Sequence, residues 1–268
     1  MMFLLGFNFC SLILSTSFLF KQSKGKLDVL LINLDKRQDK LTICDYQLKQ
    51  LNRPDYTRIS GVDGASLFDS LSKSPSSNIS DLLNVDWIKA ERTHVTATNK
   101  NQVGCTLSHL KVLKHIIAND IQNPVLILED DFGADAEAIV KTENVIEMLP
   151  ADWSLFYAGH CHYPTNSYFV NYDGHYIGEV DDELVPCSHA YVVNGAEAAK
   201  KFLDAGNTEK LELADFFAQK AQARRFIIYP FLFTQLREIP ADIKSEGGTW
   251  YTMKNESLLQ EVKQKFIQ

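Results

Sequence analysis

The sequence predicts an α/β protein with a mainly parallel central sheet. Short apolar runs such as Leu27–Leu34 and Pro124–Leu128 have the composition of strands that are buried on both faces. Segments with apolar residues at helical spacing stand between these runs. Strands that alternate with helices are typical of a parallel sheet covered by helices.

The N-terminal part of the predicted domain begins with a strand and a helix. The strand Leu27–Leu34 has a β-branched centre, and Asp35 is expected to cap the helix that follows. The apolar residues of that helix recur at helical spacing, at Leu41, Cys44, Leu48 and Leu51. A short strand is expected at Tyr56–Ile59, ended by the sequence GVDG. Residues 66–100 are rich in Ser and Asn, which predicts a long excursion or lid-like loop.

The remaining elements continue the alternation. A helix is expected from about Thr106 to Ala118, and Asn123-Pro124 separates it from the strand Pro124–Leu128. The later expected elements are a helix at Ala134–Leu149, a strand at Trp153–Tyr157, a hairpin at Tyr168–Glu179 around Asp173-Gly174, a strand at Ser188–Val193, helices at Gly195–Leu203 and Leu211–Arg224, and a strand at Phe226–Tyr229.

The first 24 residues differ from the rest. Met1–Phe20 has no charged side chain, and lysines follow it at once. This length is close to what crosses a bilayer. A signal anchor and a cleaved signal peptide are both open, as are a mis-assigned start codon and a buried helix. We predict that residues 1–24 are an anchor or signal peptide, residues 25–250 the main domain and residues 251–268 a C-terminal tail.

The same segment decides the expected location. Membrane association is predicted through residues 3–20, so the protein is expected to be membrane-anchored or in the secretory pathway. If the segment is not a targeting signal, the expected location is the cytoplasm.

Composition excludes several protein classes. Acidic side chains outnumber basic ones 34 to 27, a net charge of −7, so the chain lacks the basic character of nucleic-acid binding proteins and no nucleic-acid partner is expected. Apolar residues make up 45% of the chain, enough for a sizeable core, which excludes intrinsic disorder. The five cysteines form no CxxC pair, which argues against a zinc ribbon or a disulfide scaffold.

Familiar catalytic motifs are absent from the sequence. No G-x-G-x-x-G, Walker A or G-x-S-x-G motif occurs, so a classical dinucleotide fold, a P-loop and a hydrolase elbow are unsupported. His160, Cys161 and His162 are metal-ligating residue types. However, neighbours on a strand point to opposite faces, and no further cluster completes four ligands. We interpret this tripeptide as a strand end that lines a cleft.

Three consecutive acidic residues are the most informative feature. Glu129, Asp130 and Asp131 directly follow the strand Pro124–Leu128, and ligands of open α/β sheets bind at the carboxyl ends of strands. Residues i and i+2 of a strand share a face, so Glu129 and Asp131 are candidates to bind one hard divalent cation. Asp130 is expected to point the other way. The alternative is a solvated acidic turn or a cap of the helix Ala134–Leu149.

A second candidate segment runs from Gly104 to His109. The glycine permits a close backbone approach to a ligand. Ser108 and His109 are expected in the first turns of a helix, where free N–H groups and the helix dipole favour anions. The alternative is a surface or capping pair without a function.

Five blocks in this order resemble the pattern of glycosyltransferase family 25. They read INLDKRQDK, RISGVDG, VGCTLSHLKVLKHII, PVLILEDDF and CSHAYVVNGAEAAKKFL, and the resemblance extends from about Leu27 to Ser245. The family includes lipopolysaccharide-type galactosyltransferases and collagen β-galactosyltransferases. The resemblance implies a GT-A-like, Rossmann-type domain. It also implies inverting transfer of a hexose, usually galactose, from a UDP-sugar to a glycan or glycoprotein, often with Mn²⁺ (or Mg²⁺).

The resemblance also implies roles for individual residues. The positions that match donor-side motifs are Asn33, Leu34, Asp35, Arg37, Arg58, Asp63, Gly64, Gly104, Ser108, His109, His189 and Gln235. Glu129 and Asp131 match the acidic metal-binding motif. Cys187 and Ser188 stand where the family block has glycine and threonine.

The implied chemistry needs a metal and a base. A departing UDP gains negative charge, which a cation held by carboxylates neutralises. The acceptor hydroxyl loses its proton to a base, for which Asp215 is the first candidate and Glu183 the second. For Asp215 the alternative is a solvent-facing helical carboxylate.

Two other functions remain open. One is a non-catalytic sugar-binding homologue of the same fold. The other is a glycoside hydrolase, which is disfavoured because neighbouring carboxylates on one strand cannot flank a glycosidic bond from both sides.

Overall fold

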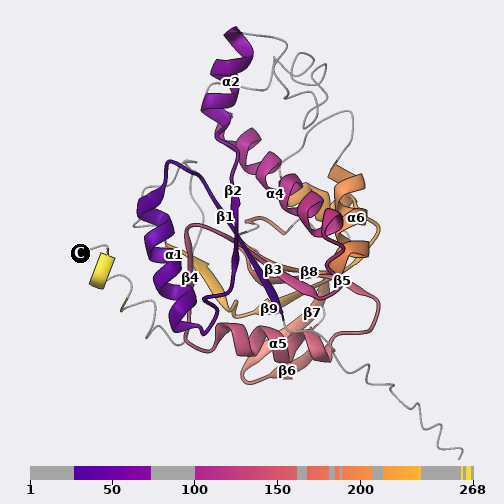
Figure 1. Ribbon diagram of the computed structural model, residues 1–268. Coiled ribbons are helices and arrows are strands. Elements are labelled where there is room, and N and C mark those ends of the chain that lie inside the picture. Colours follow the sequence, from indigo (N-terminus) through magenta and orange to yellow (C-terminus); the bar gives the residue numbers. More distant parts are fainter. Residues whose placement is uncertain are drawn as a thin grey trace, which may run out of the picture.

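The computed structural model describes residues 27–73, 100–161, 168–180, 185–187, 189–206, 214–236, 261 and 264–266 (Figure 1). The predicted N-terminal targeting segment and the candidate base Glu183 lie outside these residues. Within the described ranges, no helix combines the length and the apolar character needed to cross a membrane.

Among the described residues, a central sheet of eight strands organises the fold, in the order β2-β1-β3-β8-β5-β9-β7-β6. The strands are β1 (Asp28–Asn33), β2 (Thr57–Ser60), β3 (Pro124–Glu129), β5 (Trp153–Gly159), β6 (Tyr168–Tyr172), β7 (His175–Val180), β8 (Ala190–Asn194) and β9 (Arg224–Tyr229). Strand β1 runs parallel to β2 and β3, and β5 runs parallel to β9. Strand β8 lies antiparallel between β3 and β5, and β7 lies antiparallel between β9 and β6.

All strands of this sheet except β7 and β8 therefore point in the same direction. The predicted α/β class with a mainly parallel sheet is confirmed, and the arrangement is compatible with a GT-A-like fold. The hairpin predicted around Asp173 and Gly174 is confirmed as β6–β7, and both turn residues have positive φ (48° and 75°), which suits a tight turn.

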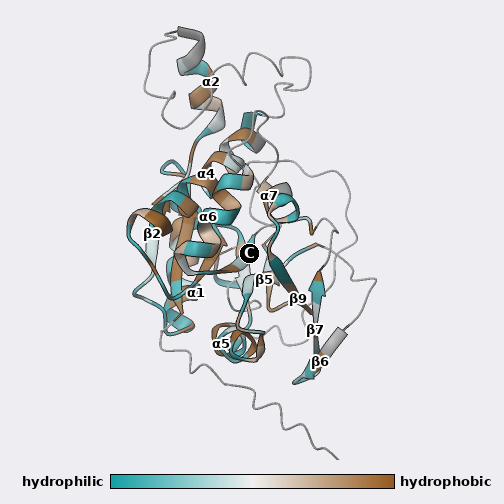
Figure 2. Cartoon of the chain, turned by 90° about the vertical axis from the view of Figure 1, so that its right-hand side faces the viewer, coloured by the Kyte–Doolittle hydropathy of each residue, from teal (hydrophilic) through white to brown (hydrophobic). Residues whose placement is uncertain are grey.

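Helices cover both faces of the sheet. One core packs α1 (Gln38–Gln50) and α5 (Ala138–Met148) against one face. The other packs α4 (Lys100–Ala118), α6 (Gly195–Gly206) and α7 (Ala214–Lys220) against the opposite face. Figure 2 shows hydrophobic and hydrophilic residues alternating along α4, as expected of a helix with one face on the sheet. The strands in between are buried on both sides, which explains their continuous apolar runs.

Helix α4 begins at Lys100 and not near Thr106, so the predicted start was wrong. Val103 and Leu107 in its first turns join a small core with Phe217 of α7, which stabilises the additional turns. Ser108 and His109 consequently lie in the helix interior, where backbone N–H groups bond within the helix. The predicted anion site at a free helix N-terminus is therefore wrong for these two residues.

Three other local expectations need correction. Asp35 does not cap α1, whose N-cap is Arg37 without a side-chain cap. Part of the expected loop at residues 66–100 is helical, because α2 spans Gly64–Lys73 and packs on α4. The helix expected from Ala134 starts at Ala138, because residues 132–134 pair as a strand.

That strand belongs to a second, small sheet that the sequence did not predict. Strand β4 (Phe132–Ala134) pairs antiparallel with β10 (Phe233–Gln235). The backbone N–H of Leu236 also donates to the carbonyl of Asp131. This pairing brings the end of the described domain beside the acidic residues that follow β3.

A disulfide joins Cys161, just after β5, to Cys187, just before β8. The cysteine spacing did not predict this pair, although a single disulfide is not the disulfide scaffold that the sequence argued against.

In the described part of the predicted C-terminal tail, Phe266 packs edge-on against Tyr46 of α1 with a centroid separation of 5.4 Å.

Candidate functional site

One edge of the sheet gathers polar side chains from four strands that are distant in sequence. Asn33, Ser60 and Glu129 are the last residues of β1, β2 and β3, and His189 directly precedes the antiparallel strand β8. The pairing register brings Asn33 opposite Ser60 and Leu128 opposite Ala190, so these ends lie at one level. The site therefore forms where α/β sheets ordinarily bind ligands.

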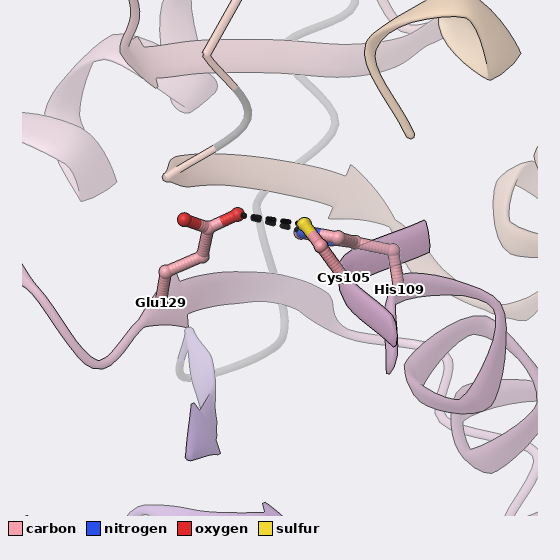
Figure 3. Close-up of side chains that lie close together, drawn as sticks. All are labelled: Cys105, His109 and Glu129. Atoms are coloured by element: carbon pink, nitrogen blue, oxygen red, sulfur yellow. Dashed lines mark hydrogen bonds and ion pairs between the residues drawn. The ribbon is translucent and has the colours of Figure 1, made fainter. Parts of the chain in front are cut away.

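Residues 129–131, called the acidic turn below, distribute their side chains between the two faces of the sheet. Glu129 points to α4, where its Oε1 lies 2.9 Å from Nε2 of His109 and 3.7 Å from Sγ of Cys105 (Figure 3). Nδ1 of His109 lies 2.8 Å from the hydroxyl of Tyr191. Burial opposes ionisation of Glu129, but the hydrogen bond and charge of His109 outweigh it and lower the pKa of the carboxyl.

Asp130 points to the opposite helix layer, as the strand alternation predicted. Its Oδ1 accepts a 2.8 Å hydrogen bond from Nζ of Lys40, and its Oδ2 accepts one of 2.9 Å from Nδ2 of Asn33. The Lys40 and Asp130 side chains are only 4% and 11% exposed. This buried, hydrogen-bonded pair anchors the acidic turn to α1 and β1.

Asp131 has an unusual environment for a carboxyl group. Its Oδ1 is buried and has no hydrogen-bond partner within the part of the chain that the structure describes. Burial, reinforced by the negative charge of Glu129, raises the pKa of Asp131 to about 7. A cation between the Glu129 and Asp131 carboxylates would give the buried oxygen of Asp131 a partner and would offset the repulsion between the two negative charges. The two carboxylates therefore fit a hard divalent ion. Their assignment as metal ligands stays a prediction.

The predicted donor-side residues of β1 and β2 form one hydrogen-bonded group. Arg58 donates from Nε to Oδ1 of Asn33 at 2.9 Å and from a terminal nitrogen to Oδ1 of Asp35 at 2.6 Å. Ser60 donates to the other oxygen of Asp35 at 2.8 Å. These hydrogen bonds, that of Arg58 first, lower the pKa of Asp35. Asn33 thus connects this group to the acidic turn, because it also bonds Asp130.

The other two predicted residues of this segment lie in the loop between β1 and α1. Leu34 is half-buried, and its carbonyl accepts the backbone N–H of Arg37. The Arg37 side chain pairs with Asp39 at 2.8 Å.

Gly64 and Gly104 approach each other's backbone. A Cβ on Gly104 would lie 2.5 Å from the carbonyl oxygen of Val62 and 2.6 Å from the nitrogen of Gly64. Ser108 Oγ accepts the backbone N–H of Val62 at 2.8 Å and donates to the Gly104 carbonyl. Both glycines and Ser108 therefore pack α2 against α4, and close helix packing by itself explains the glycines. Asp63 pairs with Lys36 at 2.7 Å.

His189 and Gln235 lie beside the acidic turn. The backbone carbonyl of His189 accepts the N–H of Glu129 at 2.9 Å, and its ring Nε2 lies 3.3 Å from the carbonyl of Phe233 in β10. Gln235 pairs with Phe132, directly after the turn. Gly159 is required here, because a Cβ on it would lie 2.5 Å from the His189 ring.

Cys187 has a backbone φ of 69°, a left-handed conformation that glycine adopts without cost. This explains why the family block that begins at position 187 ordinarily has a glycine there. Cys187 retains the glycine-like backbone while it forms a disulfide with Cys161.

The remaining candidates are the two proposed bases and the tripeptide at 160–162. Asp215 belongs to α7, whose placement is described, although that of its side chain is not. The position of Glu183 lies outside the described residues. His160 is 2% exposed and its Nε2 contacts the carbonyl of Ile228 at 2.8 Å, and Cys161 is bound in the disulfide. Neither residue supports a zinc site at 160–162.

Sequence reasoning missed three contributors, namely Lys40, Cys105 and Tyr191. Cys105 and His109 are four positions apart, which places them on the same face of a helix, so this relation was available from the sequence. The pairing of Lys40 with Asp130 and of Tyr191 with His109 joins residues from different elements, which no local pattern indicates.

Comparison with known proteins relates the chain to a glycosyltransferase family and to a curated galactosyltransferase. The model of glycosyltransferase family 25 (LPS biosynthesis protein) matches residues 26–217. Procollagen galactosyltransferase 2 from Homo sapiens is 26% identical over 139 residues, covering 49% of this chain and 20% of that protein. The match thus extends over about one fifth of the length of this curated relative.

Proposed function

The chain belongs to glycosyltransferase family 25, and we propose that it transfers galactose from UDP-galactose to a hydroxyl group of a glycan or glycoprotein. The observation that carries the proposal is the paired environment of Glu129 and Asp131. Two neighbouring carboxylates, one with a buried oxygen that has no hydrogen-bond partner among the described residues, lie at the ligand-binding edge of the sheet. The galactosyl specificity is supported by the name of the procollagen galactosyltransferase relative.

Glu129 and Asp131 would hold a divalent cation, Mn²⁺ or Mg²⁺. When bound, such an ion neutralises charge that develops on the departing diphosphate. Neighbouring residues hold the Glu129 carboxyl group and the backbone of the acidic turn in place. His109 anchors Glu129 from α4, and the Lys40–Asp130 pair anchors the turn from α1. The site is thus organised in advance, which electrostatic catalysis requires.

The donor nucleotide is proposed to bind over the ends of β1 and β2. The predicted residues there are Asn33, Asp35 and Arg58, with Asp63 nearby on the chain. Asp35 is 71% exposed in its side chain and Arg58 28%, so both can reach a ligand. The hydrogen bonds that link them fix the direction in which the guanidinium and the carboxylate point.

An inverting transfer needs one base on the acceptor side. We propose Asp215 for this role, with Glu183 as the second candidate. A carboxylate there would take the proton of the acceptor hydroxyl as the new glycosidic bond forms and the bond to the diphosphate breaks. The structure describes neither side chain, so the assignment depends on mutagenesis of both.

We also propose a secretory or membrane-associated location. The proposal is supported by the apolar segment at residues 3–20 and by the Cys161–Cys187 disulfide, since disulfides persist in oxidising compartments. Expression of the full chain with a C-terminal reporter, followed by fractionation and protease protection, tests this. A cytosolic, fully reduced protein would contradict it.

A UDP-release assay tests the proposed reaction. The purified chain is incubated with a panel of UDP-sugars and hydroxyl acceptors, with Mn²⁺, with Mg²⁺ and with a chelator. We expect UDP release that requires the divalent ion and is fastest with UDP-galactose. Binding of a UDP-sugar without turnover on any acceptor would indicate a non-catalytic sugar-binding protein.

A further inference from the structure

We propose that Cys105, His109 and Glu129 form a second cation site, selective for a borderline-soft ion such as Zn²⁺, and that an ion bound there inhibits sugar transfer. The thiol, the imidazole and the carboxylate each offer one ligand atom, and these atoms all lie within 4.8 Å of one another (Figure 3). The donor set differs in kind from the pair of carboxylates proposed for the hard cation.

The distances suit a small tetrahedral ion. With Zn–S near 2.3 Å and Zn–N and Zn–O near 2.0 Å, the ligand atoms of a tetrahedral site are roughly 3.3–3.6 Å apart. Cys105 Sγ lies 3.7 Å from Glu129 Oε1, close to this spacing. His109 Nε2 lies 2.9 Å from the same oxygen, so the ion requires a small outward movement of the Glu129 side chain.

The fold holds two of the ligands in place. Cys105 and His109 are one turn apart on α4, so their side chains share a face of one rigid helix. Tyr191 contacts Nδ1 of His109 at 2.8 Å. When Nδ1–H donates to that hydroxyl oxygen, Nε2 presents its lone pair to the site, which is how neighbours orient metal-binding histidines.

An ion can reach this position from outside. His109 is only 2% exposed in its side chain, but the Glu129 side chain is 23% exposed and Cys105 is half-buried, so solvent reaches two of the three ligands. Binding releases the thiol proton of Cys105 to solvent and displaces the proton with which Nε2 of His109 bonds Glu129, so that the thiolate and the Nε2 lone pair bind the ion. Water can fill the fourth position, because three protein ligands converge among the residues that the structure describes.

Glu129 belongs to both cation sites, so the two ions compete. A thiolate and an imidazole favour Zn²⁺ over Mn²⁺ or Mg²⁺, whereas carboxylates alone favour the hard ions. Zn²⁺ at the cluster withdraws Glu129 from Asp131 and weakens the hard-cation site. This inhibitory consequence rests on the proposed function, but the binding of the ion does not.

Spectroscopy with Co²⁺ as the probe tests binding without any activity measurement. The full chain is titrated with Co²⁺ in the absence of thiol reductant, so that the Cys161–Cys187 disulfide stays closed. We expect a thiolate-to-cobalt charge-transfer band that Zn²⁺ abolishes at equimolar concentration. Absence of the band from the wild-type protein would overturn the proposal.

Matched single-thiol variants identify the ligand. Cys105→Ser should lose the band. Cys44→Ala should keep it, because Cys44 is fully buried beneath the acidic turn. Cys10→Ser should also keep it, because Cys10 is not among the three proposed ligands. Tyr191→Phe keeps the ring but removes the hydroxyl, and it should weaken Zn²⁺ affinity about 10- to 100-fold. A band that persists in Cys105→Ser, or disappears in Cys10→Ser, contradicts the assignment.

Inhibition is tested separately, on the UDP-release reaction. In the wild-type protein, the Zn²⁺ concentration that halves the rate should increase as Mn²⁺ is raised. For each protein, inhibition is expressed as the Zn²⁺ concentration that halves its own zinc-free rate. This concentration should be at least about tenfold higher for Cys105→Ser than for the wild-type protein. If no UDP-sugar is turned over, the proposed transferase function is wrong. The Co²⁺ titration still decides whether the cation site exists. If Zn²⁺ binds but does not compete with Mn²⁺, the inhibitory role is wrong.

Discussion

Lys40 of α1 donates a 2.8 Å hydrogen bond to Asp130, a residue 90 positions away in the sequence, and both side chains are largely buried. The pair connects the helix layer on one face of the sheet to the turn that carries Glu129 and Asp131. Asn33 completes the connection by donating to the second oxygen of Asp130 at 2.9 Å. The position of the acidic turn therefore depends on residues that do not themselves face the proposed donor.

Loss of the lysine should destabilise the fold and disturb the site. Lys40→Met leaves the Asp130 carboxylate buried with Asn33 as its side-chain hydrogen-bond donor among the described residues. We expect this to lower the free energy of unfolding by about 3–5 kcal/mol. Chemical denaturation measures this change. The double variant Lys40→Met/Asp130→Asn removes both charges and should recover much of the loss. Lys200→Met, in an exposed pair with Asp204, is the control and should change stability by less than about 0.5 kcal/mol.

The metal assignment predicts a specific defect for Asp131. Asp131→Asn keeps the size of the side chain but removes its charge, so Mn²⁺-dependent UDP release should be lost while the melting temperature is retained or raised. Stability should not fall, because the native carboxyl is buried beside another negative charge. The rate is followed as a function of Mn²⁺ concentration. Unchanged turnover with the same metal dependence would refute the assignment.

His109→Ala should affect stability and metal dependence together. Both ring nitrogens contact protein groups, so truncation leaves Glu129 and Tyr191 without this partner and should cost about 1–3 kcal/mol. The Mn²⁺ concentration for half-maximal UDP release should rise, because Glu129 loses its anchor. Thermal unfolding and metal titration on the same variant measure both effects. A 10- to 100-fold loss of kcat/KM with unchanged stability would instead support a direct hydrogen bond from His109 to the donor.

The packing of α2 against α4 makes Gly104 sensitive to the smallest substitution. In a free helix, Gly104→Ala would stabilise the helix by up to about 1 kcal/mol. Here the new methyl group would meet the Val62 carbonyl at 2.5 Å and the Gly64 nitrogen at 2.6 Å. We therefore expect destabilisation of about 1–3 kcal/mol. Lys114→Ala, at an exposed position of the same helix, is the control and should be nearly neutral. A stabilised Gly104→Ala variant would show that this contact is absent.

Removal of residues 1–24 should leave a folded protein that still releases UDP. The first strand begins at Asp28, and the buried Leu27 is retained in the shortened chain. Circular dichroism, thermal unfolding and the UDP-release assay compare the shortened and full chains. Loss of cooperative unfolding in the shortened chain would show that the apolar segment contributes to the core.

The sequence by itself determined the order of most elements and the place of the site along the chain. Continuous apolar runs mark β1, β3 and β5 because these strands are buried on both faces, and the acidic residues mark the end of β3 because charges are excluded from such runs. The i, i+2 alternation also gave the opposite directions of Glu129 and Asp130, since it is a local property of extended backbone.

Only the tertiary structure decided which residues support that site. The early start of α4, the β4–β10 pair and the Cys161–Cys187 disulfide each depend on contacts between distant segments. The same holds for the Lys40–Asp130 pair and for the contact of His109 with Tyr191. Periodicity and capping rules describe neighbours within one or two turns of the chain. Which helix faces which strand end is fixed by the packing of the two helix layers on the sheet.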